Sequence, residues 1–215
     1  MGAEGPAPDL TAAGTEVLTQ ILFEARSWGF LGPGPVEPHI AHALGFAAAL
    51  GARPRRLADL GSGGGVPGLV LAQLWPETDV VLIDANQRRT DFLTTVGERL
   101  DRSAPPTVVR GRAEDVGREA AWRASFDAVV ARGFASPAVT AECAAPLLVV
   151  GGRLVVSEPP DGTQRWPSDK LRVLGLEVGP GSVQAAGRFQ LLRLATPCPA
   201  KYPRSTGRPA KRPLF

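Results

Sequence analysis

The stretch "LADLGSGGGVPGLVLAQLWPETDVVLID" (Leu57 to Asp84) decides the fold. An apolar run leads into a glycine-rich turn, a helical pattern follows from Pro67, and a second apolar run ends at Asp84. A strand, a helix and a second strand joined so closely predict a βαβ unit with parallel strands. Its glycines also match GxGxxG, which lets the backbone approach a ligand closely. Taken alone, the GxGxxG match is weak evidence, because a tight turn without a ligand is the alternative.

The alternation of strands and helices continues along the chain. Short apolar strands between helices predict a doubly wound, mostly parallel α/β sheet of the Rossmann-like type, covered on both faces. Near the end, "LEVGPGSVQAAGRFQLLRLAT" predicts an antiparallel hairpin at the sheet edge. Predicted strands are Arg56–Leu60, Val80–Ile83, Thr107–Val109, Ala128–Ala131 and Arg153–Val156. Predicted helices are Thr15–Trp28, Pro38–Leu50, Pro67–Trp75, Arg88–Arg102, Ala113–Arg123, Pro137–Val149 and Trp166–Leu174.

These elements predict four parts of the chain. We expect a disordered start at residues 1–9, an N-terminal helical cap at 10–51, a cofactor-binding domain at 52–197 and a basic tail at 198–215. The composition, 44% hydrophobic and 21% charged, is typical of a globular protein. No segment has the length of a membrane helix or the pattern of a signal peptide. Two cysteines make neither a disulfide framework nor a metal site, so a cytoplasmic, metal-free monomer is expected.

The tail holds the basic excess of the chain. The sequence has 24 Lys and Arg against 21 Asp and Glu, and its net charge is +3. Residues 198–215 include no acid and five of the cations: Lys201, Arg204, Arg208, Lys211 and Arg212. A Pro- and Gly-rich basic tail fits either a solvated, disordered terminus or an arm that contacts RNA phosphates. If the tail is such an arm, deleting residues 198–215 should weaken RNA binding and leave the affinity for the cofactor unchanged.

Acidic residues follow three successive strands. Asp59 precedes the glycines, Asp84 ends the second strand, and Ala113–Glu114 follow the third. Asp84 is placed to bind ribose hydroxyls in either of two cofactors, NAD or S-adenosylmethionine. Asp59 would oppose a pyrophosphate but attract an ammonium or sulfonium, so the set favours S-adenosylmethionine. Glu114 alone also fits a charge that complements a helix dipole.

Longer motifs identify a family that the chain resembles. The stretch from Leu57 to Leu93, "RAED" and "FDAVVARGFAS" are similar to the 16S rRNA guanine-7 methyltransferases, also called glucose-inhibited division protein B. The ending "KYPRSTGRPAKRPL" resembles the basic ending of many members. The resemblance implies a class I methyltransferase that acts on 16S rRNA in the small ribosomal subunit. It implies cofactor contacts at Gly61, Val66, Ala113, Glu114 and Arg132, with Asp84 at the ribose. From the residues themselves we also expect Asp59, Gly63 and Gly65 in the cofactor site.

The departures from this family lie on the substrate side. Ser157 and Glu158 stand where members usually have lysine and glycine, and Gly45 stands near the aspartate of a family motif. After Trp28, "GFLGPGP" replaces a family element. These differences leave open another RNA or a small molecule as substrate, or a catalytically silent paralogue that binds the cofactor. An NAD-dependent oxidoreductase is the alternative from a different enzyme class.

Arg132 is the residue expected to act in catalysis. Methylation of the 7-nitrogen of guanine needs no general base, because this nitrogen has a lone pair and no proton, so positioning dominates. Arg132 lies at the end of the fourth strand, where it could hold the carboxylate of the cofactor or an RNA phosphate; the alternative is an ion pair with Asp127. Phe134 fits base stacking or packing equally. Packing or surface roles are expected for Cys143, His39, His42, Trp122 and Trp166.

Overall fold

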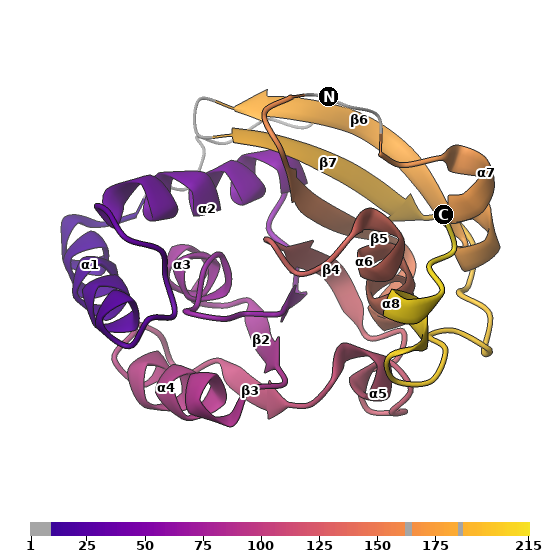
Figure 1. Cartoon of the computed structure of the whole chain (residues 1–215). Helices are drawn as coiled ribbons and strands as arrows, with labels where there is room; N and C mark the ends of the chain where they lie inside the picture. The colour runs from indigo at the N-terminus through magenta and orange to yellow at the C-terminus, as the bar shows by residue number, and fades with distance from the viewer. Residues whose placement is uncertain (1–9, 162–164, 185–186) are drawn as a thin grey trace.

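The computed structural model describes residues 10–161, 165–184 and 187–215 of this chain. Figure 1 shows one twisted sheet with helices on both of its faces. Helices α1 to α4 lie on the left of this view, and α5, α6 and α8 lie on the right. The disorder predicted for residues 1–9 falls outside the described residues.

The sheet has seven strands in the order β3-β2-β1-β4-β5-β7-β6. Every pair from β3 to β5 is parallel, whereas β5–β7 and β7–β6 are antiparallel. The predicted mostly parallel sheet with a C-terminal hairpin is therefore confirmed. The strands are β1 (Arg56–Leu60), β2 (Asp79–Asp84), β3 (Thr107–Arg110), β4 (Phe126–Ala131), β5 (Leu148–Glu158), β6 (Leu176–Gln184) and β7 (Gly187–Leu194).

The helices follow the sequence pattern with shifted ends. They are α1 (Ala12–Ser27), α2 (Glu37–Leu50), α3 (Gly68–Leu74), α4 (Gln87–Gly97), α5 (Ala113–Val116), α6 (Pro137–Ala144), α7 (Ser168–Leu171) and α8 (Arg208–Lys211). Two single 3₁₀ turns, Ala145–Leu147 and Arg172–Leu174, follow α6 and α7. Pro146 ends α6 early, because a proline ring clashes with the preceding helical turn. The helix predicted over Ala113–Arg123 shortens to one turn that Gly117 caps.

Alternate side chains of each strand enter two separate cores. Leu57 packs under α1 to α4, whereas the next residue, Ala58, packs under the opposite layer with α5 and α6. Helix α1 contacts α3, and α2 contacts α3, β5 and β7, so the N-terminal helices share a core with the sheet. Because both faces are covered, polar side chains of the parallel strands gather at their ends.

A close contact between α2 and β7 accounts for one departure from the family motif. Gly45 lies on the buried side of α2, where the Phe189 ring covers it. A Cβ atom at Gly45 would lie 2.5 Å from Cζ of Phe189, which is closer than packed atoms come. A glycine at this position therefore leaves room for the aromatic ring of β7.

Replacing Gly45 should destabilise the fold. We expect Gly45→Val to lower the free energy of unfolding by about 1–3 kcal/mol, because the added atoms force Phe189 from its position. Urea denaturation measures this difference. Gly32→Val is the matched control, since a Cβ atom at Gly32 meets nothing within 4 Å. Equal losses in the two variants would contradict the packing argument.

His42 should contribute to the pH dependence of stability. Its ring packs against Phe46 and Phe189, and its buried Nδ1 has no partner among the described residues. Burial, with Arg132 and His39 nearby, lowers the pKa of His42 to about 4. The unfolded chain therefore binds a proton at higher pH than the folded chain, and stability is lost as the pH falls from about 6.5 towards 4.

The variant His42→Leu tests this contribution, because leucine keeps an apolar side chain and does not titrate. Urea denaturation at about pH 7 and about pH 5 gives the stability lost on acidification. We expect a smaller loss in His42→Leu than in the unchanged protein. An identical loss would show that His42 takes no part.

Candidate cofactor and substrate site

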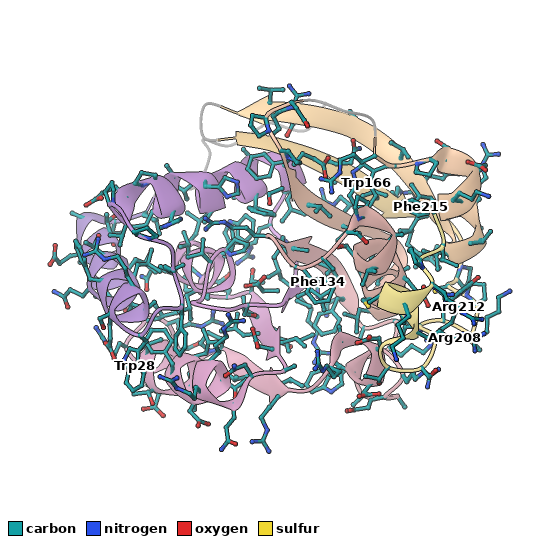
Figure 2. The ribbon with its side chains drawn as sticks, in the orientation of Figure 1. Trp28, Phe134, Trp166, Arg208, Arg212 and Phe215 are labelled. Atoms are coloured by element: carbon teal, nitrogen blue, oxygen red, sulfur yellow. The ribbon has the colours of Figure 1, made fainter. Side chains whose placement is uncertain are left out.

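The carboxyl ends of the parallel strands surround a cavity of about 320 Å³. Parallel strands end at one edge of a sheet, which is where open α/β folds bind ligands. The cavity wall includes Asp84 after β2, Ala113 and Glu114 after β3, and Phe134 after β4. Phe134 lies near the middle of the molecule in Figure 2. The volume lies within the range of small-molecule and cofactor sites.

The glycine loop forms a tight turn at the floor of this cavity. The backbone amides of Gly61 and Ser62 both donate to the Ile83 carbonyl oxygen, at 2.9 and 3.0 Å, and this ties the loop to β2. Gly61 has a φ of 76°, and a Cβ atom there would lie 2.6 Å from the Phe134 ring. Glycine at position 61 thus allows both the left-handed backbone of the turn and the close approach of the Phe134 ring.

Asp84 braces the loop from the cavity wall. Its Oδ2 accepts from the Gly63 amide at 2.9 Å, and its Oδ1 accepts from the Asn86 amide at 2.8 Å. Arg89 Nη1 lies 3.7 Å from Oδ2 of Asp84 and also lines the cavity. Asp84 therefore lies where a ligand hydroxyl could be bound. The contribution of Arg89 was not visible in the sequence.

Asp59 is buried beneath the loop. Its side chain is 1% exposed, and its Oδ2 accepts from the Gly68 amide at 2.9 Å, at the start of α3. Burial raises the pKa of Asp59 to about 7, and Asp84 adds to this shift, whereas the hydrogen bonds of Gly68 and Ser62 oppose it. The sequence did not reveal that α3 takes up this carboxylate.

The remaining loop residues support the turn more than they face the cavity. Among the described residues, the cavity lining includes neither Asp59, Gly63, Gly65 nor Val66. Val66 is 6% exposed and belongs to the core under α1 to α4. Direct contact of these four residues with a cofactor stays a prediction.

Arg132 points to a histidine. Its Nη2 lies 2.7 Å from Nδ1 of His39, so this nitrogen of His39 accepts the hydrogen bond. Burial lowers the pKa of Arg132, and the charge of Asp59 opposes that shift. Asp127 accepts instead from the Arg56 amide, at 2.8 Å, and no ion pair joins Asp127 to Arg132 in the described structure. Nη1 of Arg132 is buried without a partner among the described residues. The described lining of the cavity does not include Arg132, so its contact with a ligand stays a prediction.

A second cavity of about 290 Å³ adjoins the first. The two share Gly133, Phe134 and Ala135, and the second continues to Ser157, Glu158, Arg165 and Trp166. Glu158 Oε1 accepts from Nε1 of Trp166 at 3.1 Å, and burial raises the pKa of Glu158. Trp166 belongs to the core under α5 and α6, as expected, and it also lines this cavity. The departure at Ser157 and Glu158 therefore lies in a wall next to the cofactor cavity.

The basic tail packs against the body of the protein. Residues 202 and 203 are buried, and Arg204 contacts the buried Glu142 through three hydrogen bonds. The expectation of a solvated, disordered terminus is therefore wrong. Arg204 was predicted to bind RNA, but its guanidinium is held by a carboxylate. The exposed cations of the tail are Lys201, Arg208, Lys211 and Arg212.

Other candidate chemistry is limited among the described residues. No group of three or more His, Cys, Asp or Glu side chains in the described ranges could hold a metal ion. Within the same ranges, no helix is long and apolar enough to span a membrane. Cys143 is fully buried in the core, as expected, and burial raises the pKa of its thiol.

The fold occurs in methyltransferases and related proteins of known structure. A variant of MtNAS solved in complex with S-adenosylmethionine is similar over 86% of this chain and 76% of its own, with a TM-score of 0.57 and 15% identity. The cofactor-bound protein Rv0187 from MTB is similar over 90% of this chain and 99% of its own, with a TM-score of 0.59 and 19% identity. At these identities the likeness concerns the fold.

Sequence relatives are more specific. The family model "rRNA small subunit methyltransferase G" (GidB) matches residues 36–159. Ribosomal RNA small subunit methyltransferase G of Rubrobacter xylanophilus is 39% identical over 84% of this chain and 76% of its own. The enzyme of the same name from Roseiflexus castenholzii is 37% identical over 84% of this chain and 80% of its own. The matching family model and these relatives show that the chain belongs to the rRNA small subunit methyltransferase G family.

Proposed function

We propose that this protein transfers a methyl group from S-adenosylmethionine to the 7-nitrogen of a guanine in 16S rRNA of the small ribosomal subunit. The observation that carries the proposal is the pair of adjoining cavities that share Phe134, in a chain of this family. One cavity suits the methyl donor and the other a base. A reaction between two bound molecules needs this adjacency, because the reacting atoms must be held within contact distance.

The first cavity fits S-adenosylmethionine by its chemistry. The Phe134 ring lies against Gly61, and the wall of the cavity includes the carboxylates of Asp84 and Glu114. Asp84 would accept from the ribose hydroxyls, Ala113 and Glu114 would contact the adenine, and the free donor of Arg132 would meet the carboxylate. When bound, the cofactor supplies an electrophilic methyl group on a sulfonium. The buried Asp59 favours that positive charge across the loop.

The protein itself aligns the guanine with the methyl group and excludes water from the site. The 7-nitrogen of guanine has a lone pair and no proton to remove, so the transfer requires alignment and no general base. The Phe134 ring lies over Gly61 between the two cavities, where it can stack on a base that has left its helix. The exposed tail cations Lys201, Arg208, Lys211 and Arg212 would contact RNA phosphates.

A second candidate keeps the cofactor and changes the substrate. Ser157 and Glu158 line the second cavity, where family members usually have a lysine followed by a glycine. Glu158 is paired with Arg165 of the same wall at 3.6 Å, so this wall differs in charge and shape from a lysine and glycine wall. Another RNA or a small molecule is therefore the alternative substrate. A silent paralogue would bind the cofactor and transfer nothing.

Asp84→Asn should weaken cofactor binding. Asparagine keeps one acceptor oxygen, so one of the two amide hydrogen bonds from Gly63 and Asn86 is lost together with the charge. We expect the dissociation constant for S-adenosylhomocysteine to rise about tenfold or more, as measured by calorimetry. Asp91→Asn on the exposed side of α4 is the matched control and should bind like the unchanged protein. The same titration with NAD should give no binding, and tight NAD binding would favour an oxidoreductase.

Methyl transfer tests the substrate directly. Tritiated S-adenosylmethionine is incubated with 16S rRNA, free or in small subunits, from a strain that lacks this gene. We expect incorporation into at least one of the two substrates, at a guanine 7-nitrogen. Arg132→Met should reduce the rate about 100-fold or more, because the cofactor loses an orienting donor and the histidine contact disappears. Intact cofactor binding without incorporation into either RNA would contradict the rRNA assignment.

A further inference from the structure

We propose that the C-terminal segment, residues 198–215, is a fixed wall of the cofactor cavity, and that Arg204 and Glu142 form the latch that holds it there. Arg204 is then a positioning residue for cofactor binding. In Figure 1 the yellow segment with α8 lies beside α5 and α6 at the edge of the strand ends. The proposal rests on the cavity being the cofactor site, and it reverses the expectation that the tail can be removed without loss of cofactor affinity.

The latch joins a buried acid to a single arginine. Glu142 lies on α6 and has no exposed surface. Its Oε1 accepts from the Arg204 amide and from Nε, each at 2.8 Å, and its Oε2 accepts from Nη2 at 2.6 Å. A carboxylate without solvent needs such a partner, because an unpaired buried charge is strongly unfavourable. Undocking the tail would leave Glu142 as an unpaired buried charge, so the docked tail is the stable state of the folded protein.

Two further arginines of the body hold the part of the tail that precedes Arg204. Arg123 donates to the carbonyl oxygens of Tyr202 and Cys198, at 2.7 and 2.9 Å. Arg118 donates to the Pro203 carbonyl oxygen at 2.8 Å. These contacts bind backbone groups, so they fix the path of the tail rather than one side chain.

The part of the tail that follows Arg204 reaches the cofactor cavity. Gly207 has a φ of 78°, and its amide donates to Oε1 of Glu114 at 2.9 Å. Glu114 lines the cavity, and so does Ala210 from α8. The tail thus contributes one wall residue directly and holds a second through a backbone amide. Undocking the tail would remove Ala210 and release the carboxylate of Glu114.

Docking also links the two ligands of the enzyme. Arg208, Lys211 and Arg212 lie on the exposed surface of the same short segment whose inner side meets the cavity; Figure 2 labels Arg208 and Arg212 there. RNA phosphates bound to this outer side would favour the docked segment, and cofactor bound on the inner side would favour it too. Two ligands that favour one state strengthen each other's binding by the same factor.

The test compares two variants of the full chain. Calorimetry gives the dissociation constant for S-adenosylhomocysteine in the unchanged protein, Arg204→Met and Arg204→Lys. We expect an increase of about tenfold or more in Arg204→Met and a smaller one in Arg204→Lys, which keeps the charge beside Glu142. Arg172→Met, at an exposed arginine remote from both cavities, is the matched control and should bind as before. Thermal unfolding confirms that each variant is folded at the temperature used.

Hydrogen exchange gives a readout that a purely structural role would not change. In the unchanged protein, S-adenosylhomocysteine should slow exchange of the backbone amides at residues 204–212, because the ligand favours the docked segment. Equal exchange with and without the ligand would overturn the proposal, and so would unaltered affinity in a folded Arg204→Met. Neither measurement involves RNA. If the affinity and exchange measurements give the expected results but no methyl group is incorporated into rRNA, only the assignment of rRNA as the substrate is wrong.

Discussion

Burial of both faces of a parallel sheet is the constraint on which the rest of this structure depends. The strands can keep polar side chains only at their ends, and parallel strands end at one edge. Asp59, Asp84 and Glu114 are therefore brought to the same edge, although they are far apart in the sequence. The Gly63 amide, after β1, donates to the carboxylate of Asp84 at the end of β2, and this hydrogen bond ties the two strand ends together. The polar cavity lies at this edge because helices cover both faces of the sheet.

The C-terminal segment completes this edge through charge pairing. Removing one partner from a buried ion pair typically lowers the free energy of unfolding by about 3–5 kcal/mol. The stability of the fold therefore depends on the pairing of Glu142 with Arg204. Arg118 and Arg123 fix the neighbouring carbonyl groups, and the same segment then passes Glu114. The basic residues of the tail therefore differ in their surroundings: Arg204 is held by Glu142, whereas Lys201, Arg208, Lys211 and Arg212 are exposed.

The sequence predicted the elements well where periodicity and turn residues agreed. β1 has the predicted bounds, and the hairpin of β6 and β7 lies at the sheet edge as expected. Prediction failed where tertiary contacts replaced local preference. Arg123 leaves the expected helix to bind carbonyl groups of the tail, and the tail itself has a composition typical of disorder but is held by buried partners. Such partners lie more than 60 residues away, beyond the reach of any local pattern.

The sequence by itself determined the fold class, the cofactor and the family, because glycine spacing, acids after strands and longer motifs are local features of the chain. Only the tertiary structure decided what each charged group does. It turned Asp59 toward the α3 amide, paired Arg132 with His39 and Arg204 with Glu142, and placed Glu158 and Trp166 in the second cavity. The physical reason is burial: a charge or donor without water must find a partner, and folding alone determines which groups meet.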